Sequence, residues 1–364
     1  MFKAVKELNK KQQENLKVED TNRKLAINPN DTLNIIASFF KEKFQSETAT
    51  EIEAFTGSPR KQHQPITIEE VKKSFDNLNN NRAPGEGGIH AELLKYGTQE
   101  PNKQIAKILN QTFERHENLD INAGELIAIP KPGKPKGPPK NLRPITLLNT
   151  IRKVLSKITL ERIRPHVEQY LSHSQSGFRP NRSTSDVAWT HKWLAAKVNV
   201  ENIAIKIAEI DKSAAFDTIN RETLLKILED IVNEDENRII RFLLSNTIID
   251  TKIIGATEKK PFFSNVGTPQ GDSLSPVLFT FYLEHALKEV RPVLPKPSTP
   301  LEKVLPREIA YADDVDFFAF QDIDIEEVGK VLEKYNLQVN VDKTEFTNLS
   351  RGETNWQTTK KVAP

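Results

Sequence analysis

The amino-acid sequence predicts an α+β fold in which a β-sheet is backed by helices. In the first 200 residues apolar side chains recur at helical spacing, as in Val71, Phe75 and Leu78. From Ile203 the pattern changes to the β-branched run IAIKIAEID, which is typical of a buried strand. Two helices, an apolar strand pair, a third helix and a last strand are expected to follow it. This order of elements predicts a sheet that helices cover.

The N-terminal part of the chain is expected to contain capped helices. After a polar segment at 1–30, DTLNIIASFFKEKFQ predicts a helix with Asp31 or Thr32 as its N-cap. Thr67 and Glu70 have the spacing of a capping box, which predicts the start of a second helix.

Further elements are expected along the chain. ELIAIP predicts a short strand that runs into a loop rich in Pro, Gly and Lys at 131–141. A long helix is expected from about 150 to 171, and the almost wholly apolar segment 273–290 predicts a buried helix. The five prolines between 291 and 307 predict a surface loop.

Composition favours a globular protein without a membrane partner. Hydrophobic residues make up 37% of the chain and charged residues 28%, which is too mixed for a disordered chain. No apolar run approaches membrane-spanning length, and the charged N-terminus is not a secretory signal. The absence of Cys excludes disulfides and thiolate zinc sites, and it fits an intracellular protein.

Positive charge is concentrated in one segment. Ten Lys or Arg residues lie between Lys131 and Arg164 against the single acid Glu161, so this segment carries +9 in a chain of net charge +2. Such a segment fits a phosphate-rich partner. A solvated basic face that binds nothing explains the charge equally well.

Three segments combine features that indicate chemistry rather than packing. Asp211 ends the apolar strand, and Asp313 and Asp314 interrupt an otherwise apolar hairpin in the tetrapeptide YADD. The loop GTPQGDSLSP, residues 267–276, precedes the apolar helix. Carboxylates on core strands are costly unless they are paired or bind a metal ion, so the acidic residues require an explanation.

The acidic residues have the chemistry of a magnesium site. Mg²⁺ prefers hard oxygen ligands, and two such ions about 3.5–4 Å apart can activate an attacking hydroxyl and stabilise a leaving pyrophosphate. Because neighbouring side chains of a strand point to opposite faces, we expect Asp313 to be the main ligand opposite Asp211 and Asp314 to be the second. The alternative is an Asp pair in a solvent-facing turn.

Together these segments resemble the ordered motifs of reverse transcriptases of the non-LTR (LINE-type) retrotransposon branch. The resemblance extends from about residue 30 to the end of the chain. The matching segments are NRAPGEGGIHAELLK (81–95), IPKPGK (129–134), NLRPITLLNTIRKVLSKI (141–158), QSGFRPNRST (175–184), DKSAAFDTINR (211–221), GTPQGDSLSPVLF (267–279), YADD (311–314) and LQVNVDKTEF (337–346).

The resemblance implies the fingers and palm of a right-hand polymerase, with a ferredoxin-like palm sheet. The fingers are expected at 56–200 and the palm with the catalytic site at 201–350. Residues 1–55 are expected to be a helical extension and 351–364 a truncated approach to the primer grip. A thumb and an N-terminal endonuclease do not fit in the chain, so weak binding of primer–template and impaired catalysis are expected.

The resemblance also implies the catalytic residues. Asp211, Asp313 and Asp314 would hold two Mg²⁺ ions, for which Mn²⁺ is a substitute, with the Lys212 carbonyl as a further ligand. Lys343 matches a lysine proposed as general acid to the leaving pyrophosphate. An ordinary surface lysine is the alternative for Lys343.

Five residues match positions that bind the incoming dNTP. Lys131 and Arg143 would clamp the triphosphate, although Lys131 is also explained as one more solvated lysine. Phe216 matches a steric gate that excludes a ribose 2′-OH by a built-in clash, or it is simply a core residue. Gln270 and Gly271 match a loop that contacts nucleotide and template, where glycine permits a close approach of the backbone.

Arg179, Arg182 and Tyr311 are expected to contact template or primer, although a structural salt bridge fits Arg179 equally well. Asp272 departs from the family pattern, because its charge would repel phosphate if it faced the nucleotide.

The activity that the resemblance implies is RNA-directed DNA polymerisation, in which dNTPs are added to a DNA primer on an RNA template. One alternative is a catalytically weak or silent nucleic-acid-binding remnant of a mobile element. The other is an RNA-dependent RNA polymerase, against which Phe216 argues. The resemblance also implies an intracellular ribonucleoprotein in the nucleus or the cytoplasm, and the oligomeric state is left open.

Overall fold

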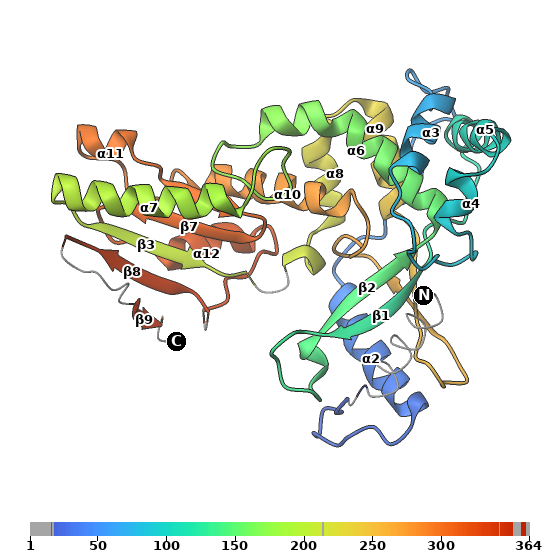
Figure 1. Ribbon diagram of the computed structural model, residues 1–364, viewed down its shortest axis with the longest axis horizontal. Coiled ribbons are helices and arrows are strands. Elements are labelled where there is room, and N and C mark those ends of the chain that lie inside the picture. Colours follow the sequence, from blue (N-terminus) through green and yellow to red (C-terminus); the bar gives the residue numbers. More distant parts are fainter. Residues whose placement is uncertain (1–15, 17, 213–214, 342, 352–357, 362–364) are drawn as a thin grey trace. The chain divides into compact units, whose positions relative to one another are not determined.

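The computed structural model describes residues 16, 18–212, 215–341, 343–351 and 358–361 (Figure 1). The chain divides into two compact units, which we describe separately. Unit 1 comprises the chain up to Ile163 together with Val232–Ser275, and unit 2 comprises Arg164–Ile231 together with the chain from Pro276 onwards. This division describes packing, so the fingers at 56–200 and the palm at 201–350 stay predictions.

Unit 1 contains a four-stranded sheet and a set of helices. The sheet has the order β2-β1-β4-β5. Its strands are β1 (Gly124–Pro130), β2 (Leu142–Leu148), β4 (Thr247–Thr251) and β5 (Lys260–Ser264). The helices are α2 (Pro29–Phe44), α3 (Ile68–Asp76), α4 (Ala91–Lys95), α5 (Glu100–Arg115), α9 (Glu234–Leu244), the 3₁₀ turn η1 (Pro139–Asn141) and most of α6 (Thr150–Tyr170), which continues into unit 2.

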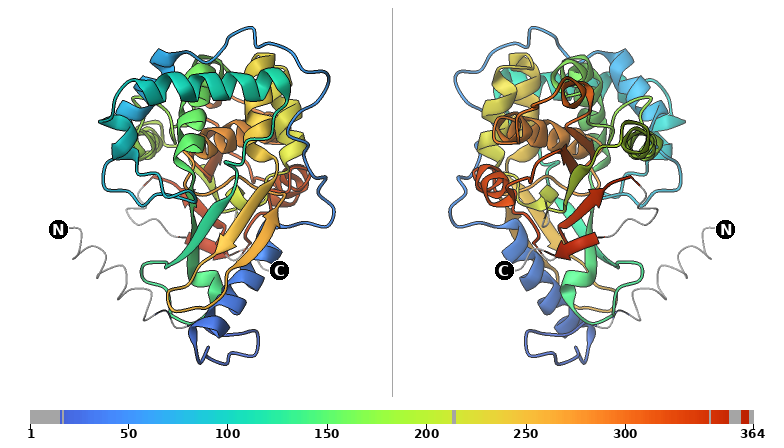
Figure 2. Two further views of the ribbon diagram at one scale, coloured as in Figure 1. Left: turned by 90° about the vertical axis from the view of Figure 1, so that its right-hand side faces the viewer. Right: turned by 90° about the vertical axis from the view of Figure 1, so that its left-hand side faces the viewer.

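Helix α2 forms one core of unit 1 with the sheet. Its apolar face presents Ile36, Phe40 and Phe44, which pack with Leu126 of β1 and Phe262 of β5. Figure 2 shows α2, in blue, beside these strands. One face of α2 is therefore buried, as the helical spacing of its apolar residues predicts.

Unit 2 is built on a second, fully antiparallel sheet with the order β6-β7-β3-β8-β9. Its strands are β3 (Ile205–Ile210), β6 (Glu308–Tyr311), β7 (Asp314–Ala319), β8 (Glu345–Leu349) and β9 (Thr358–Lys361). Its further elements are α7 (Thr184–Glu201), η2 (Ala215–Asp217), α8 (Arg221–Glu229), α10 (Ser275–Val290, whose first residue belongs to unit 1), α11 (Pro300–Val304) and α12 (Ile325–Glu333). The first four strands have the order and the intervening helices of a ferredoxin-like sheet. The predicted α+β class is confirmed.

Helix α7 covers one face of the unit 2 sheet (Figure 1). Leu194 and Val198, one turn apart, pack on Ile205 and Ile207 of β3 and on Phe318 of β7. Because residues two apart on a strand share a face, this face continues along β3 to Glu209 and then towards Asp211. Ile205 and Ile207 anchor β3 to the core at one end of this face. The polar residues Glu209 and Asp211 lie at the other end, where the strand ends.

Most predicted elements are present, with a few corrections. Thr67 and Glu70 form the predicted capping box at the start of α3. The N-cap of α2 is Asn28 rather than Asp31 or Thr32, because the Asn28 side chain accepts a hydrogen bond from the Asp31 backbone N–H. Helices α4 and α9 and strand β2 were not predicted.

The segment 291–307 is not wholly a surface loop. It contains the helix α11, and Glu302 within it is buried. The Glu302 carboxylate accepts hydrogen bonds from the Ser298 hydroxyl and backbone N–H, which replace its lost contacts with water. In the part of the chain that the structure describes, no helix is long and apolar enough to cross a membrane.

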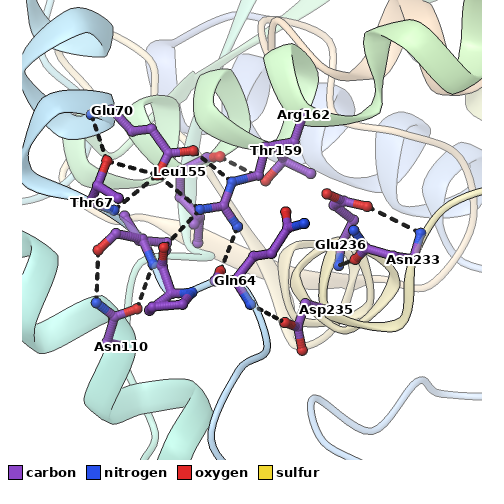
Figure 3. Close-up of polar contacts among 12 residues, drawn as sticks. Gln64, Thr67, Glu70, Asn110, Leu155, Thr159, Arg162, Asn233, Asp235 and Glu236 are labelled. Carbon is purple, nitrogen blue, oxygen red and sulfur yellow. Dashed lines mark hydrogen bonds and ion pairs between the residues drawn. The ribbon is translucent and has the colours of Figure 1, made fainter.

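Some of the basic residues between Lys131 and Arg164 form hydrogen bonds and ion pairs within unit 1. The Arg162 guanidinium forms two hydrogen bonds to the Glu70 carboxylate, 2.7 and 2.8 Å long, and donates to the Gln64 and Pro65 carbonyls (Figure 3). The Lys157 ammonium donates to the Asn77 carbonyl at the end of α3. These two residues hold α6 against α3, so they are explained without a phosphate-rich partner.

Arg152 is wholly buried in unit 1 beside a buried carboxylate. Its guanidinium donates to Asn122 Oδ1 and lies 3.4 Å from Asp272 Oδ2. Asp272 also accepts hydrogen bonds from the Ser156 hydroxyl, at 2.9 Å, and from the Leu274 backbone N–H. Burial lowers the pKa of Arg152, and the neighbouring Asp272 charge opposes that shift. Asp272 is therefore the counter-charge that makes the buried arginine tolerable.

We predict that Asp272→Ala lowers the free energy of unfolding by about 3–5 kcal/mol, because it leaves a buried guanidinium without its counter-charge. Urea denaturation measures the change. The matched control is Glu114→Ala, which removes an exposed ion pair with Lys61 and should cost less than about 1 kcal/mol. Equal losses in the two variants would contradict this account of Arg152.

Candidate functional site

Strand pairing brings the YADD hairpin beside the end of β3. The last pair between β3 and β7 is Ile210 with Val315. Asp211 lies one residue beyond this pair, and the next position along β7 is Asp314, its first residue. Continued by one residue, the register would place Asp211 opposite Asp314, and Asp313 lies in the turn between β6 and β7. The assignment of Asp313 as the main ligand opposite Asp211, with Asp314 as the second, stays a prediction.

The acidic side chains of this hairpin share one electrostatic environment with Asp211. Partial burial, and then the nearby charges of Asp313 and Asp211, raise the pKa of Asp314, while Lys212 opposes the shift. Asp314 is nevertheless exposed, and Asp211 and Asp313 are partly exposed. The charges of Asp211 and Asp313 therefore act on the Asp314 carboxylate, which remains accessible to a ligand from solvent.

Lys212 supplies a buried positive charge among these carboxylates. Its side chain is 4% exposed, and its ammonium donates a hydrogen bond to the Asp313 backbone carbonyl. Burial lowers the pKa of Lys212 to about 8, and the charges of Asp313, Asp314 and Asp211 oppose this shift. The sequence indicated only the Lys212 carbonyl; the side chain is an additional contact that it did not predict.

Lys343 holds one oxygen of Asp211. Its ammonium lies 2.8 Å from Asp211 Oδ2, and its side chain is 63% exposed. Within the described residues, no three Asp, Glu or His side chains are gathered closely enough to hold a metal ion. The carboxylate oxygens are nevertheless the hard donors that Mg²⁺ prefers. The donor chemistry fits the predicted ion, provided that the exposed Lys343 leaves Asp211 and the side chains turn towards one another.

Phe216 lies on η2, directly after the segment that follows Asp211. Its ring stacks on Phe279 of α10 with centroids 4.1 Å apart, and it meets the edge of Phe178 at 6.1 Å. The side chain remains partly exposed. It is therefore anchored as a core residue and still presents part of its surface, so the two interpretations of Phe216 are compatible.

The loop before α10 is held against β2 within unit 1. The Gln270 carbonyl accepts a hydrogen bond of 2.7 Å from the Thr146 backbone N–H. Gly271 has φ +122°, and a Cβ atom there would lie 2.5 Å from the Thr146 carbonyl oxygen. Glycine is thus required for close approach to a strand. Asp272 points into the interior of unit 1, where its carboxylate lies beside Arg152 and Ser156.

Lys131 and Arg143 lie at one end of the β1–β2 hairpin in unit 1. Lys131 directly follows β1, and Arg143 pairs with Ile129 of that strand. The Lys131 ammonium donates to the Lys140 carbonyl at 2.8 Å, whereas the Arg143 side chain is exposed. Two cations close together on a hairpin suit an anionic ligand, and their contact with a triphosphate stays a prediction.

Arg179 makes the structural salt bridge that the sequence allowed. Its side chain is 6% exposed, it donates to the Glu168 carboxylate from Nε and Nη2, and Nη1 donates to the Ser172 and Gln175 carbonyls. Arg182 is exposed just before α7, and Tyr311 is partly buried at the end of β6. Contact of these three residues with template or primer stays a prediction.

The structure adds one residue to the site that the sequence did not single out. Gln175 is buried and forms hydrogen bonds through its side chain to the backbone of Ala312, in the turn that carries Asp313. The residue stands at the start of the motif QSGFRP, but nothing in the sequence joins it to a turn 137 residues away.

Comparison with known proteins matches this architecture to one family. Residues 129–362 match the family model of reverse transcriptase (RNA-dependent DNA polymerase). The chain is 25% identical to the transposon TX1 uncharacterized 149 kDa protein of Xenopus laevis, over 74% of this chain and 21% of that protein. It is 24% identical to the Pol polyprotein of the retrotransposable element R2 of Popillia japonica, over 70% of this chain and 34% of that protein.

A further relative and one solved structure are also similar to parts of the chain. The chain is 24% identical to the RNA-directed DNA polymerase of the mobile element jockey of Drosophila funebris, over 60% of this chain and 24% of that protein. A structure of apo telomerase from Candida tropicalis has a TM-score of 0.47 at 18% identity, covering 66% of this chain and 53% of that chain.

These relatives confirm the predicted resemblance to the non-LTR retrotransposon branch. The chain spans about a fifth to a third of the length of the curated relatives named here. The family model alone covers well over half of the chain and includes every motif from IPKPGK to LQVNVDKTEF. The chain therefore belongs to the reverse transcriptase (RNA-dependent DNA polymerase) family.

Proposed function

We propose that this chain is an RNA-directed DNA polymerase, which adds dNTPs to a DNA primer on an RNA template. One observation carries the proposal: Asp211 leaves β3 one residue beyond its pairing with β7, at the end of the sheet where Asp313 lies in the β6–β7 turn and Asp314 begins β7. Membership of the reverse transcriptase family supports the same activity. The proposed reaction joins the primer 3′-oxygen to the α-phosphorus of the dNTP and releases pyrophosphate.

Reverse transcriptases generally use divalent metal ions, and we propose two Mg²⁺ ions here, for which Mn²⁺ can substitute. Asp211, Asp313 and Asp314 would hold them with the Lys212 carbonyl. The bound ions supply the activation of the primer hydroxyl and the stabilisation of the leaving pyrophosphate. With the ions bound, Lys343, which here pairs with Asp211, would release that carboxylate, and its ammonium would be the proton donor to the leaving pyrophosphate.

We further propose roles for the surrounding residues. Lys131 and Arg143 bind the triphosphate, Gln270 and Gly271 contact the nucleotide, and Phe216 excludes the ribose 2′-OH. Template and primer contacts involve Arg182 and Tyr311, which are at least partly exposed, and Arg179, whose guanidinium would act by holding its loop. In the cell we place the chain in a ribonucleoprotein in the nucleus or the cytoplasm.

The proposal is tested by primer extension on poly(rA)/oligo(dT) with dTTP and Mg²⁺. We predict that Asp211→Ala and Asp313→Ala each reduce the extension rate by at least about 100-fold, more than the loss of a supporting contact costs. The matched control is Asp322→Ala, which removes a solvent-exposed carboxylate paired with Lys206 of β3 and should leave the rate unchanged.

The outcomes separate the alternatives. Extension by the wild type that depends on Asp211 and Asp313 supports the polymerase. No extension by any variant, together with binding of the primer–template, supports a silent nucleic-acid-binding remnant. Extension with UTP in preference to dTTP supports an RNA polymerase instead.

A second prediction concerns the choice of sugar. Phe216→Val replaces the partly exposed ring by a shorter side chain, which leaves room for a ribose 2′-OH. We therefore expect the preference for dTTP over UTP in kcat/KM to fall at least about tenfold, equivalent to ~1.4 kcal/mol. Phe279→Leu is the matched control, because it weakens the same aromatic stack while the Phe216 ring remains. An unchanged preference in Phe216→Val, or an equal change in Phe279→Leu, would remove the gate assignment.

A further inference from the structure

The first residues of the motif QSGFRP pair with β6, next to the turn that carries Asp313. The Ala310 backbone N–H donates to the Ser174 carbonyl at 2.9 Å, and the Ser176 N–H donates to the Ala310 carbonyl at 2.8 Å. Gln175 thus forms a parallel bridge with Ala310. Both segments belong to unit 2, and the bridge ends two residues before the turn that carries Asp313.

The Gln175 side chain binds both backbone groups of one residue in that turn. Its Oε1 accepts hydrogen bonds from the Ala312 N–H at 3.1 Å and from the Gly177 N–H at 2.7 Å, and its Nε2 donates to the Ala312 carbonyl at 3.2 Å. Gln175 is 2% exposed. Because water has little access here, these contacts satisfy backbone groups that would otherwise be left unpaired.

Ala312 has an unusual backbone conformation. Its φ is +59°, in the left-handed region that residues with a Cβ atom rarely adopt. Residues in this region persist only where their surroundings hold them, and such strain is common at functional sites. Here Ala312 is held by the Oε1 and Nε2 atoms of the Gln175 side-chain amide. A different conformation of Ala312 would change the direction in which Asp313 and Asp314 leave the turn.

Gly177 makes the contact between the loop and the turn possible. A Cβ atom at Gly177 would lie 2.1 Å from the Ala312 nitrogen and 3.1 Å from the Ala312 Cβ. There is therefore no room for any other residue. The segment 175–177 therefore fits the turn in two ways. The Gln175 side chain forms hydrogen bonds with it, and Gly177 lacks a side chain that would clash with it.

We propose that Gln175 is a positioning residue of the polymerase site, which fixes the left-handed Ala312 and so directs Asp313 and Asp314 towards Asp211. The proposal rests on the proposed function for its catalytic consequence. It extends that function by giving the loop 175–177 a role in the geometry of the acidic turn rather than in contact with a substrate.

The test is Gln175→Met, which keeps the length of the side chain and removes its donor and acceptor. We expect kcat for primer extension to fall by about 10- to 100-fold, as for other residues that orient catalytic ligands, with little change in KM for dTTP. Hydrogen–deuterium exchange should show faster exchange of the Ala312 amide, with unchanged exchange in β3. The exchange measurement does not depend on activity.

A second variant tests the left-handed conformation itself. Glycine adopts positive φ without a Cβ penalty, so Ala312→Gly added to Gln175→Met should recover part of the lost kcat. The matched control is Tyr282→Phe, which deletes another buried hydrogen bond of unit 2, from the Tyr282 hydroxyl to the Tyr335 carbonyl. It should lower Tm and leave kcat unchanged.

Wild-type kcat in Gln175→Met, or unchanged exchange of the Ala312 amide, would overturn the proposal. So would a loss of kcat in Tyr282→Phe equal to that in Gln175→Met, because the effect would then follow stability alone. If the wild type shows no extension, the proposed function fails, and the exchange of the Ala312 amide still decides whether Gln175 holds the turn.

Discussion

The antiparallel pairing of β3 with β7 is the constraint on which the site depends. A strand register has a period of two, so a shift of one residue would turn Glu209 and Asp211 to the opposite face and bury them in place of Ile210. The apolar contacts of Ile205 and Ile207 with α7 prevent such a shift. A hydrophobic contact at one end of β3 therefore determines where a carboxylate stands at the other end.

That placement concentrates negative charge, and the chain offsets it with two lysines of different character. Lys212 is buried and tied to the Asp313 carbonyl, so it belongs to the structure of the turn. Lys343 is exposed and paired with Asp211, so it can exchange with a solvated cation at small cost. With Lys212 as a permanent charge and Lys343 as an exchangeable one, the site could fold without a metal ion and still bind one.

Local features could be predicted from the sequence, because neighbouring residues determine them. The strand before Asp211, the helix α10 and the Thr67–Glu70 capping box all follow from spacing and residue type. Long-range partners could not be predicted. Arg152 meets Asp272 across 120 residues, so a residue that contributes to a basic segment proved to be buried and paired. The left-handed Ala312 also carries no local signal, because alanine does not mark that conformation.

The central claim is that Asp211 and the YADD aspartates come together on shared divalent ions. Crystals of the chain soaked in Mn²⁺ would test it most directly, through the anomalous scattering of the ion. The account predicts an anomalous peak bridged by the Asp211 carboxylate and by Asp313 or Asp314, at a ligand distance of about 2 Å. A peak that contacts only one of these strands, or Asp211 still paired with Lys343 in saturating Mn²⁺, would contradict it.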